Sequence, residues 1–422
     1  MKKLIVVYDK GAVNPLEAYA GLSAIAQPVF AVAPSEHGER ALKVVERLGE
    51  SVVLGSSASR SADRLRRFTP AGIVTFSEDM VQPTAELARH LKLYYHQEPT
   101  LGCLKDKHLQ RLRLRQCGVD GTMTRRIQTR ADFAAAMEEF DAPVILKPAR
   151  GGASRDTHVI THPGRGAQLV DALLDRYLPA GLVIEELLVG RRMPSGVGDY
   201  ISIESAVVDG RITHLAVTGK FALAAPFREV GQFWPALLDE DTRCASLNLA
   251  TAGLTALDVR RGVTHTEIKL TPDGPRIIEI NGRLGGHIHE LARRTGVSSP
   301  IEIAGTIALG VDPAPSMFSP PPGVFWQYNT PAPRRPARLM ANAHVAAVTA
   351  LEGVSQYTPY YQKGDPLDLD VMTNPLDVIS GYSKTHEEML KQVDRLLDHV
   401  VYRLDMDGTE SAVAARELVN SE

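Results

Sequence analysis

Two acidic residues and one amide stand at strand-like spacing in THTEIKL (264–270) and RIIEINGRLGG (276–286). They are Glu267, Glu279 and Asn281. Carboxylate and amide oxygens suit hard divalent cations such as magnesium, which also keeps phosphate oxygens as ligands. We therefore predict that these three residues bind metal. The alternative is an exposed strand face with solvated carboxylates, and the combined pattern favours the metal site over that alternative.

The same two segments are expected to pair as a hairpin that turns at residues 272–274. This pairing places Glu267 opposite Glu279 and His265 opposite Asn281. Strand side chains alternate between faces, so Ile277 is expected on the face that carries Glu279 and Asn281. Two carboxylates opposed across a strand pair destabilise it unless a positive group lies between them.

An anion-binding turn is expected directly after the second strand. Arg283 follows Asn281 by one alternation, so its guanidinium is predicted to enter the same pocket and hold phosphoryl oxygens. Gly285 and Gly286 allow backbone amides to approach an anion closely. His287 follows and is predicted to face the reacting group, and the alternative for it is a neutral, hydrogen-bonded histidine.

Two other segments carry candidate binding residues. A strand at Val144–Lys147 leads into the glycine-bearing loop Arg150–Asp156, whose amides and Ser154 suit phosphate oxygens. The apolar and aromatic segment 219–236 is expected to line or cover a substrate pocket. Within it, Glu229 is predicted to bind a substrate ammonium, with a surface salt bridge as the alternative.

The first hundred residues alternate between short apolar strands and helix-like stretches. This rhythm predicts a parallel sheet with helices on both faces, that is, a doubly wound domain. No GxGxxG pattern follows the first strand, so a dinucleotide site is not expected there. The expected strands and helices are Leu4–Tyr8, Pro15–Ile25, Pro28–Ala33, Gly38–Leu48, Ser51–Leu54, Gly72–Phe76 and Met80–Leu91.

The rest of the chain changes texture near residue 105. Asp106 is expected to cap a helix that ends near Gly118. Later segments predict a strand at Leu182–Glu186, a hairpin of Tyr200–Val208 with Ile212–Thr218, a strand at His344–Val348 and a helix from Thr385 to Val401. The predicted domains are an N-terminal α/β domain (1–100), a central region (101–310) with a subdomain at about 120–190, a proline-rich linker or crossing loop (311–337) and a C-terminal α+β lobe (338–422).

Composition limits the partners and the compartment. The 422 residues suit two or three subdomains, and 47 basic against 50 acidic residues give no electrostatic reason to expect nucleic acid or an anionic membrane. No apolar run reaches the ~18 residues of a membrane span. The three scattered cysteines match neither a disulfide framework nor a zinc spacing, which favours a reducing cytoplasm.

Four segments in order resemble those of the ATP-grasp carboxylate–amine ligases, over about residues 100–310. They are KDKHLQRLRLRQCGV (105–119), VILKPARGGASR (144–155), VIEELLVG (183–190) and the Glu267…Glu279-x-Asn281-x-Arg283 pattern. DYISIES (199–205) and HTEIKL (265–270) are similar to the branch that contains the bacterial L-amino acid (dipeptide-forming) ligases. The resemblance implies a multidomain ATP-grasp fold of α/β and α+β parts.

The resemblance also implies roles for individual residues. Lys107 and Lys147 would reach the ATP phosphates, with Lys147 and Arg283 stabilising phosphoryl transfer, and two magnesium ions (or manganese in their place) would bind at the acidic pair. Arg283 and Gly286 would help to hold substrate carboxylate or phosphate groups. The remaining nucleotide-binding residues would be Ser154, Glu185 or Glu186, Leu188, and Asp199 for the ribose, where the tract after the hinge departs from the family pattern.

The expected activity is therefore ATP-dependent joining of a carboxylate, activated as an acyl-phosphate, to an amine. Both substrates would be small molecules, and a homodimer is common among related ligases. One alternative keeps the fold but uses bicarbonate or a nucleotide-precursor amine. Another is an ATP-binding module without catalysis.

Overall fold

The N-terminal part of the computed structural model, which describes residues 1–367 and 372–421, is a parallel sheet with strand order β3-β2-β1-β4. Its strands are β1 (Lys3–Tyr8), β2 (Gln27–Val32), β3 (Glu50–Val53) and β4 (Pro70–Thr75). Alternate residues of β1 enter two different cores: Leu4 and Val6 lie in one, Ile5 and Val7 in the other. Both faces of this sheet are therefore buried, as a parallel sheet requires.

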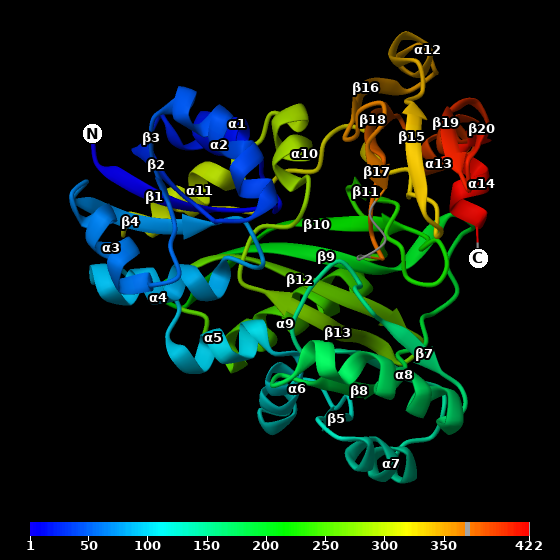
Figure 1. The fold of residues 1–422 in the computed structure, drawn as a ribbon, viewed down its shortest axis with the longest axis horizontal. Helices are drawn as coiled ribbons and strands as arrows, with labels where there is room; N and C mark the ends of the chain where they lie inside the picture. The colour runs from blue at the N-terminus through cyan, green and yellow to red at the C-terminus, as the bar shows by residue number, and fades with distance from the viewer. Residues whose placement is uncertain (368–371, 422) are drawn as a thin grey trace.

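Helices cover both faces of the N-terminal sheet (Figure 1). On one face lie α1 (Pro15–Leu22), α2 (Glu36–Leu48) and, from much later in the chain, α11 (Pro300–Ala308). On the other lie α3 (Ala58–Arg66) and α4 (Val81–Leu91). The predicted doubly wound sheet is confirmed, although α3 was not predicted because its sequence, ASRSADRLR, is strongly polar.

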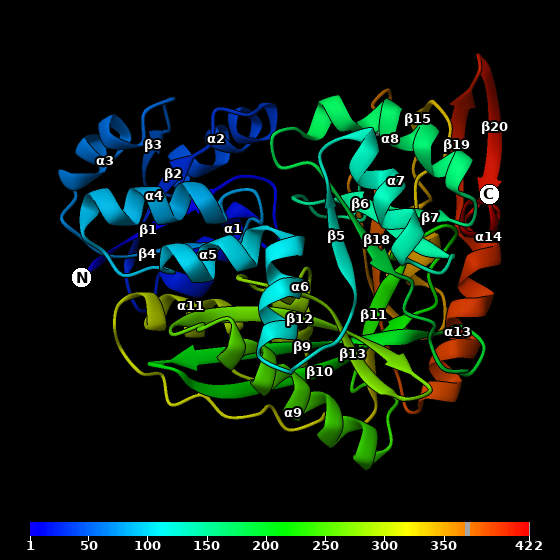
Figure 2. The same ribbon diagram turned by 90° about the horizontal axis from the view of Figure 1, so that it is seen from below.

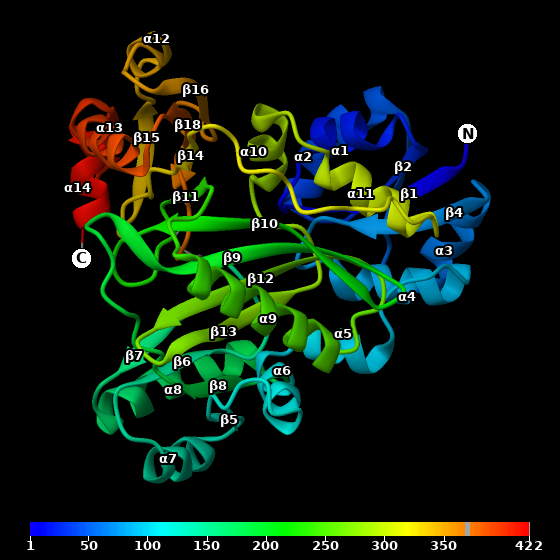
Figure 3. The same ribbon diagram turned by 180° about the vertical axis from the view of Figure 1, so that it is seen from behind.

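An antiparallel sheet with strand order β13-β12-β9-β10-β11-β14-β18-β16 forms the middle of the molecule. Its strands are β9 (Val197–Val208), β10 (Arg211–Phe221), β11 (Gly231–Trp234), β12 (Gly262–Thr271), β13 (Gly274–Asn281), β14 (Val324–Tyr328), β16 (Val354–Pro359) and β18 (Asp377–Ser383). Helix α9 (Glu240–Ala256) packs along one face of this sheet (Figure 3). Helix α9 does not cover the opposite face of β12 and β13.

A smaller antiparallel sheet with two helices lies below the central sheet in the view of Figure 1 and faces the viewer in Figure 2. It consists of β5 (Thr124–Ile127), α7 (Arg130–Glu139), β6 (Val144–Pro148), β7 (His158–Ile160), α8 (Pro163–Tyr177) and β8 (Leu182–Glu186). This subdomain has its own apolar core. Two helices connect it to the N-terminal sheet, α5 (Glu98–Lys105) and α6 (Lys107–Gln116). As predicted, the Asp106 side chain caps α6, accepting a hydrogen bond from the Leu109 amide.

The C-terminal residues add a sheet and helices that pack on the edge of the central sheet. They form β15 (Ala337–Ala341), α12 (Val345–Thr349), β17 (Pro366–Leu367), α13 (His386–His399), β19 (Val401–Met406), β20 (Thr409–Ala414) and α14 (Ala415–Asn420). No helix among the described residues is long and apolar enough to cross a membrane.

Two expectations for this region were wrong. The strand expected at His344–Val348 is absent from the described structure: Val345–Thr349 form helix α12 with His344 as its N-cap, and only Val348 of the helix is buried. The proline-rich segment 311–337 is not only a loop. It contains β14, which pairs with β11 and β18, and whose Trp326 is fully buried, since its prolines stand before and after the strand and leave its amides free to pair.

Candidate active site

The two strands that carry the acidic residues pair in the predicted register. Glu267 of β12 lies opposite Glu279 of β13, and His265 lies opposite Asn281. Each carboxylate has a basic neighbour: Lys107 Nζ lies 2.7 Å from Glu279 Oε1, and His265 Nε2 lies 3.3 Å from Glu267 Oε1. These neighbours offset the repulsion that two facing carboxylates would otherwise exert.

A bulge next to these residues overturns one expectation. The ladder passes from the Glu267–Glu279 pair to the Ile268–Ile277 pair, which leaves Ile278 as an extra residue. Ile277 is consequently buried with Ile280 on the α9 side of the sheet, and not on the face of Glu279. A bulge re-aims side chains in this way, and simple alternation does not foresee it.

The oxygen ligands that the protein offers on this face would fill only part of a magnesium coordination shell. The described residues contain no group of three or more His, Cys, Asp or Glu side chains arranged to hold a metal ion. What they offer is two facing carboxylates and the buried amide of Asn281. Magnesium is usually held by one or two carboxylates and completes its shell with water and substrate phosphates, so this set fits a metal that arrives with a nucleotide.

Arg283 reaches the same region but is held by a residue of the N-terminal domain. Its Nε lies 3.1 Å from Oε2 of Glu78, whose Oε1 also accepts from Lys105 Nζ at 2.8 Å. Burial alone would raise the pKa of Glu78, but Arg283 and Lys105 outweigh burial and lower it. Glu78 is therefore ionised and fixes the guanidinium. Nearby, Lys107 donates to the carbonyl of Gly151 in the glycine-bearing loop at 2.7 Å.

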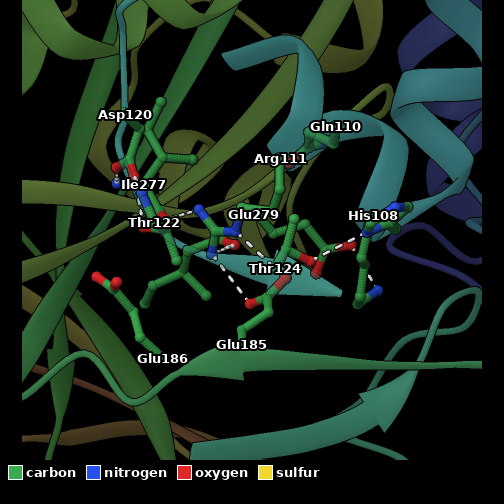
Figure 4. Close-up of polar contacts among 12 residues, drawn as sticks. His108, Gln110, Arg111, Asp120, Thr122, Thr124, Glu185, Glu186, Ile277 and Glu279 are labelled. Atoms are coloured by element: carbon green, nitrogen blue, oxygen red, sulfur yellow. Dashed lines mark hydrogen bonds and ion pairs between the residues drawn. The ribbon is translucent and has the colours of Figure 1, made fainter. Parts of the chain in front are cut away.

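A second buried charge cluster joins α6 to the small sheet. Glu185 Oε2 lies 2.7 Å from Lys147 Nζ, and Arg111 approaches the same carboxylate at 3.3 and 3.4 Å. Arg111 extends from α6 to Glu185, whereas Glu186 points away from that carboxylate (Figure 4). Burial would raise the pKa of Glu185, but the two cations lower it to about 2.

The other predicted nucleotide residues lie around these clusters with separate partners. Glu186 accepts from Arg276 at 3.0 Å, and Asp199 pairs with Lys269 at 2.6 Å. Ser154 sits in the loop after β6 with a positive φ of 52°. Leu188 lies half-buried after β8. Among the described residues, no hydrogen bond joins the Ser154 side chain to another predicted site residue, and the Leu188 side chain is apolar.

The turn after β13 differs from the expected anion cradle in one respect. The Gly285 amide is already used, since it donates to Glu204 Oε2 at 3.1 Å. This amide is therefore unavailable to an anion, and the expectation for it was wrong. Its partner, Glu204, lies on β9, which is distant from Gly285 in sequence. Gly286 is exposed, and its carbonyl accepts from Gln232 Nε2 at 2.8 Å.

His287 begins helix α10 (Ile288–Thr295) in a left-handed conformation and stacks on Tyr360 with ring centroids 6.2 Å apart. Burial, together with the charge of Lys220, lowers the pKa of His287 to about 4. Its Nε2 is also hydrogen-bonded to the Tyr360 hydroxyl at 3.3 Å, and the placement of His287 against the reacting group stays a prediction. Lys220 itself is 5 % exposed, and the one hydrogen bond of its ammonium among the described residues goes to Gln232 Oε1 at 3.3 Å.

The segment 219–236 folds as the end of β10, a loop and β11. Arg228 is buried and donates to carbonyls of Ala332 and of the chain end, including Leu418 and Ser421. It is a structural residue. Glu229 is half-buried, and its amide lies 3.3 Å from Thr373 Oγ1. No ion pair joins Glu229 to a predicted site residue in the described part of the chain.

Sequence reasoning missed four charged groups of this region: Glu78, Arg111, Glu204 and Lys220. Arg111 follows Lys107 by four residues, so helical spacing places both on one face of α6. Glu78 follows β4, and the carboxyl ends of parallel strands are a common place for ligand-binding loops. For Glu204 and Lys220, alternation along β9 and β10 identifies the face but not the partner.

Comparisons with known proteins agree with this architecture. No family model matches the chain. An alanine–anticapsin ligase of Bacillus subtilis (strain 168) is 29% identical over 234 residues, or 52% of this chain and 49% of that protein. The chain spans about half the length of the curated relatives it matches first.

Solved structures match over nearly the whole chain. An L-amino acid ligase from Bacillus licheniformis superposes with a TM-score of 0.77 at 20% identity, covering 95% of this chain and 98% of that chain. The chain has the ATP-grasp fold. A second ATP-grasp structure is the biotin carboxylase domain dimer of the Hydrogenobacter thermophilus 2-oxoglutarate carboxylase, solved with MgADP. It gives a TM-score of 0.69 at 16% identity and covers 100% of this chain and 93% of that chain.

The ATP-grasp resemblance predicted from four short segments is thus confirmed at the level of fold. The ATP-grasp chain places those segments on α6, on β6 and its loop, on β8, and on the β12–β13 hairpin. Its proposed site lies where the small sheet, the central sheet and the N-terminal domain meet. Lys107 contacts the loop of the small sheet and Glu279 of the central sheet, and Glu78 of the N-terminal domain pairs with Arg283.

Proposed function

We propose that this ATP-grasp chain is a ligase that activates a carboxylate with ATP and couples it to an amine. A substrate carboxylate oxygen attacks the γ-phosphorus while the bond to the bridging oxygen of ADP breaks. The amine then attacks the acyl carbon of the resulting acyl-phosphate, phosphate leaves, and the nitrogen loses a proton. The observation that carries this proposal is the facing pair Glu267 and Glu279 with Lys107 and Arg283 around it.

Each residue has a defined part in that reaction. Lys107 and Lys147 neutralise ATP phosphates, and Arg283 stabilises the charge that develops on the transferred group. Glu185 holds Lys147 in place, so its contribution to nucleotide binding passes through that lysine. Asp199, Leu188 and Ser154 remain the residues proposed for ribose, adenine and phosphate contacts, with Glu186 beside them.

Glu267, Glu279 and Asn281 are proposed to hold magnesium, two ions with manganese as a substitute. When bound, the metal neutralises phosphate charge and orients the triphosphate for in-line transfer. The exchange of Lys107 from Glu279 to a phosphate oxygen would free that carboxylate for the metal. Closure of the 150–156 loop excludes water from the acyl-phosphate.

The substrate side is proposed to lie between the Gly286–His287 turn and the end of β10. Lys220, a buried cation without a carboxylate partner among the described residues, supplies a positive charge for a substrate carboxylate. Glu229 is proposed for an ammonium and Gly286 for a carboxylate or phosphate oxygen. An amino acid presents both charges, and this favours amino acids or peptides as substrates.

The choice of substrate class also draws on the named relatives, an alanine–anticapsin ligase and an L-amino acid ligase. An alternative with the same fold uses bicarbonate, since a biotin carboxylase domain is similar in structure. We further propose a cytoplasmic location. A homodimer is proposed as well, because that biotin carboxylase domain is itself a dimer.

The test is a phosphate-release screen over pairs of amino acids and related acids, with mass spectrometry of the product. Phosphate release that needs both an acid and an amine supports the ligase, and bicarbonate-dependent turnover without amino acids favours the alternative. ATP binding without turnover in any mixture would indicate a non-catalytic module. Glu279→Gln and Arg283→Ala are expected to lose about 10²–10³-fold in turnover while the fold is kept. Near-full turnover in either variant would contradict the site.

A further inference from the structure

Two buried residues on neighbouring strands lie beside the proposed metal-binding face. Glu204 of β9 is 1 % exposed and His265 of β12 is 4 % exposed. The strands place them directly opposite each other, and Nδ1 of His265 is hydrogen-bonded to Oε1 of Glu204. Both side chains are closed to solvent, and their hydrogen-bond partners are other groups of the protein.

Each end of this pair holds a different part of the proposed site. His265 Nε2 lies 3.3 Å from Oε1 of Glu267, the carboxylate proposed for the metal. Glu204 Oε2 accepts the amide hydrogen of Gly285 at 3.1 Å. Gly285 stands between Arg283 and Gly286, so the pair connects the metal carboxylate to the turn proposed to bind phosphate and substrate.

The turn at Gly285 packs closely against the Glu204–His265 pair. A Cβ atom on Gly285 would lie 2.4 Å from His265 Nδ1 and 2.7 Å from Glu204 Oε1, so the position tolerates only glycine without a shift. No hydrogen bond to the other oxygen of Glu267 is found among the residues that the structure describes. His265 therefore fixes Glu267 through one oxygen and leaves the second oxygen for a ligand.

We propose that Glu204 and His265 are positioning residues that fix Glu267 and the Arg283–Gly286 turn in one arrangement, so that metal–nucleotide and substrate are held in line. The inference rests on the proposed function and deepens it. Groups that orient metal ligands from behind typically change metal affinity by about 10–100-fold when they are removed. The motifs DYISIES and HTEIKL, which suggested a branch of the family, supply this pair.

The test compares nucleotide binding with and without metal by titration calorimetry. In His265→Ala, we expect MgADP affinity to fall, and the magnesium concentration for half-maximal turnover to rise, by about 10–100-fold. The affinity for metal-free ADP is expected to stay within about twofold, a split that general loosening would not produce. Glu204→Gln keeps an acceptor for Gly285 but replaces the carboxylate that holds His265 Nδ1 by an amide, so we expect a smaller change in the same direction.

The matched control is His214→Ala. His214 is also hydrogen-bonded at both ring nitrogens, to Ser205 and Thr251, and in the described part of the chain its ring makes no hydrogen bond to a proposed site residue. It is expected to leave the magnesium dependence unchanged. Wild-type MgADP affinity and magnesium dependence in His265→Ala would overturn the inference.

If His265→Ala does not fold, Glu204→Gln alone decides, and unchanged metal affinity in that variant overturns the inference. Failure of the wild-type chain to bind MgADP would instead contradict the proposed function. The two failures are therefore distinguishable.

Discussion

Glu185 shows how single residues set the electrostatics of the site. It is 3 % exposed and lies between Lys147 and Arg111. Removing one partner of such a cluster leaves an uncompensated buried charge, which is usually costly. Burial and Arg111 lower the pKa of Lys147, whereas Glu185 opposes that shift and directs the ammonium toward the place where we propose that phosphate binds.

The first prediction concerns stability at low pH. The folded-state pKa of Glu185 is lowered from 4.5 to about 2, so its contribution is present above about pH 4.5 and is lost as the pH falls toward 2. A shift of this size corresponds to at most about 3 kcal/mol. Glu185→Gln should therefore lose less free energy of unfolding than the wild type between pH 4.5 and 2, as measured with urea. Equal slopes for the two proteins would contradict the pairing.

The second prediction concerns Lys220, whose ammonium makes its one hydrogen bond in the described structure to Gln232. Lys220→Met should raise the KM for the acid substrate by about 10–100-fold, because a charged hydrogen bond to that substrate is lost. The KM for ATP should stay within about twofold. Initial rates of phosphate release measure both constants, and a change confined to ATP would reassign Lys220.

At the scale of elements, the loop between β6 and β7 depends on backbone conformations that most residues avoid. Gly151 has a φ of 131°, and Ala153 and Ser154 follow with φ of 56° and 52°. The carbonyl of Gly151 accepts from Lys107, so the loop conformation also determines where that lysine points.

The third prediction compares two adjacent glycines of this loop. Gly151→Ala meets no atom within 4 Å but strains the backbone, so it should cost about 1 kcal/mol and raise the KM for ATP severalfold. Gly152→Ala has no positive φ, and its Cβ would meet only Glu78 Cγ at an ordinary 3.7 Å. We expect it to leave stability unchanged, as measured by thermal unfolding. Similar KM shifts in both variants would contradict a role for the backbone conformation of Gly151.

At the scale of the whole molecule, the N-terminal domain contributes directly to the site. Glu78 lies beyond β4, yet it pairs with Arg283 beyond β13 and with Lys105 on α5. All three side chains are largely buried, with 10–18% of each exposed. The relative placement of the two sheets is therefore coupled to the position of the guanidinium.

The fourth prediction tests this coupling. Glu78→Ala leaves two buried cations without their carboxylate and should lower the free energy of unfolding by about 3 kcal/mol, with loss of turnover. The control is Glu50→Ala in the same domain, which breaks a more exposed pair with Lys3 at 2.6 Å. Such a pair is worth less than about 1 kcal/mol. Urea unfolding of both variants measures the difference, and equal losses would contradict the coupling.

Local sequence patterns were enough to predict the individual strands and helices and the strand face that carries the acidic residues. Short continuous apolar runs predicted the strands of the doubly wound sheet, Asp106 predicted the start of α6, and the turn at 272–274 predicted the register of Glu267 against Glu279. These features depend on residues near one another in the chain. Propensity, capping and alternation therefore suffice to predict them.

Which charged side chains pair with each other depends on the packing of elements that are distant in sequence. Glu204 and Gly285, Glu78 and Arg283, and Arg111 and Glu185 are 74 to 205 positions apart, and no periodicity links them. The bulge at Ile278 and the burial of β14 also depend on neighbouring strands and helices. A buried charge is stable only beside its partner, and packing of whole sheets and helices, more than local sequence, brings these partners together.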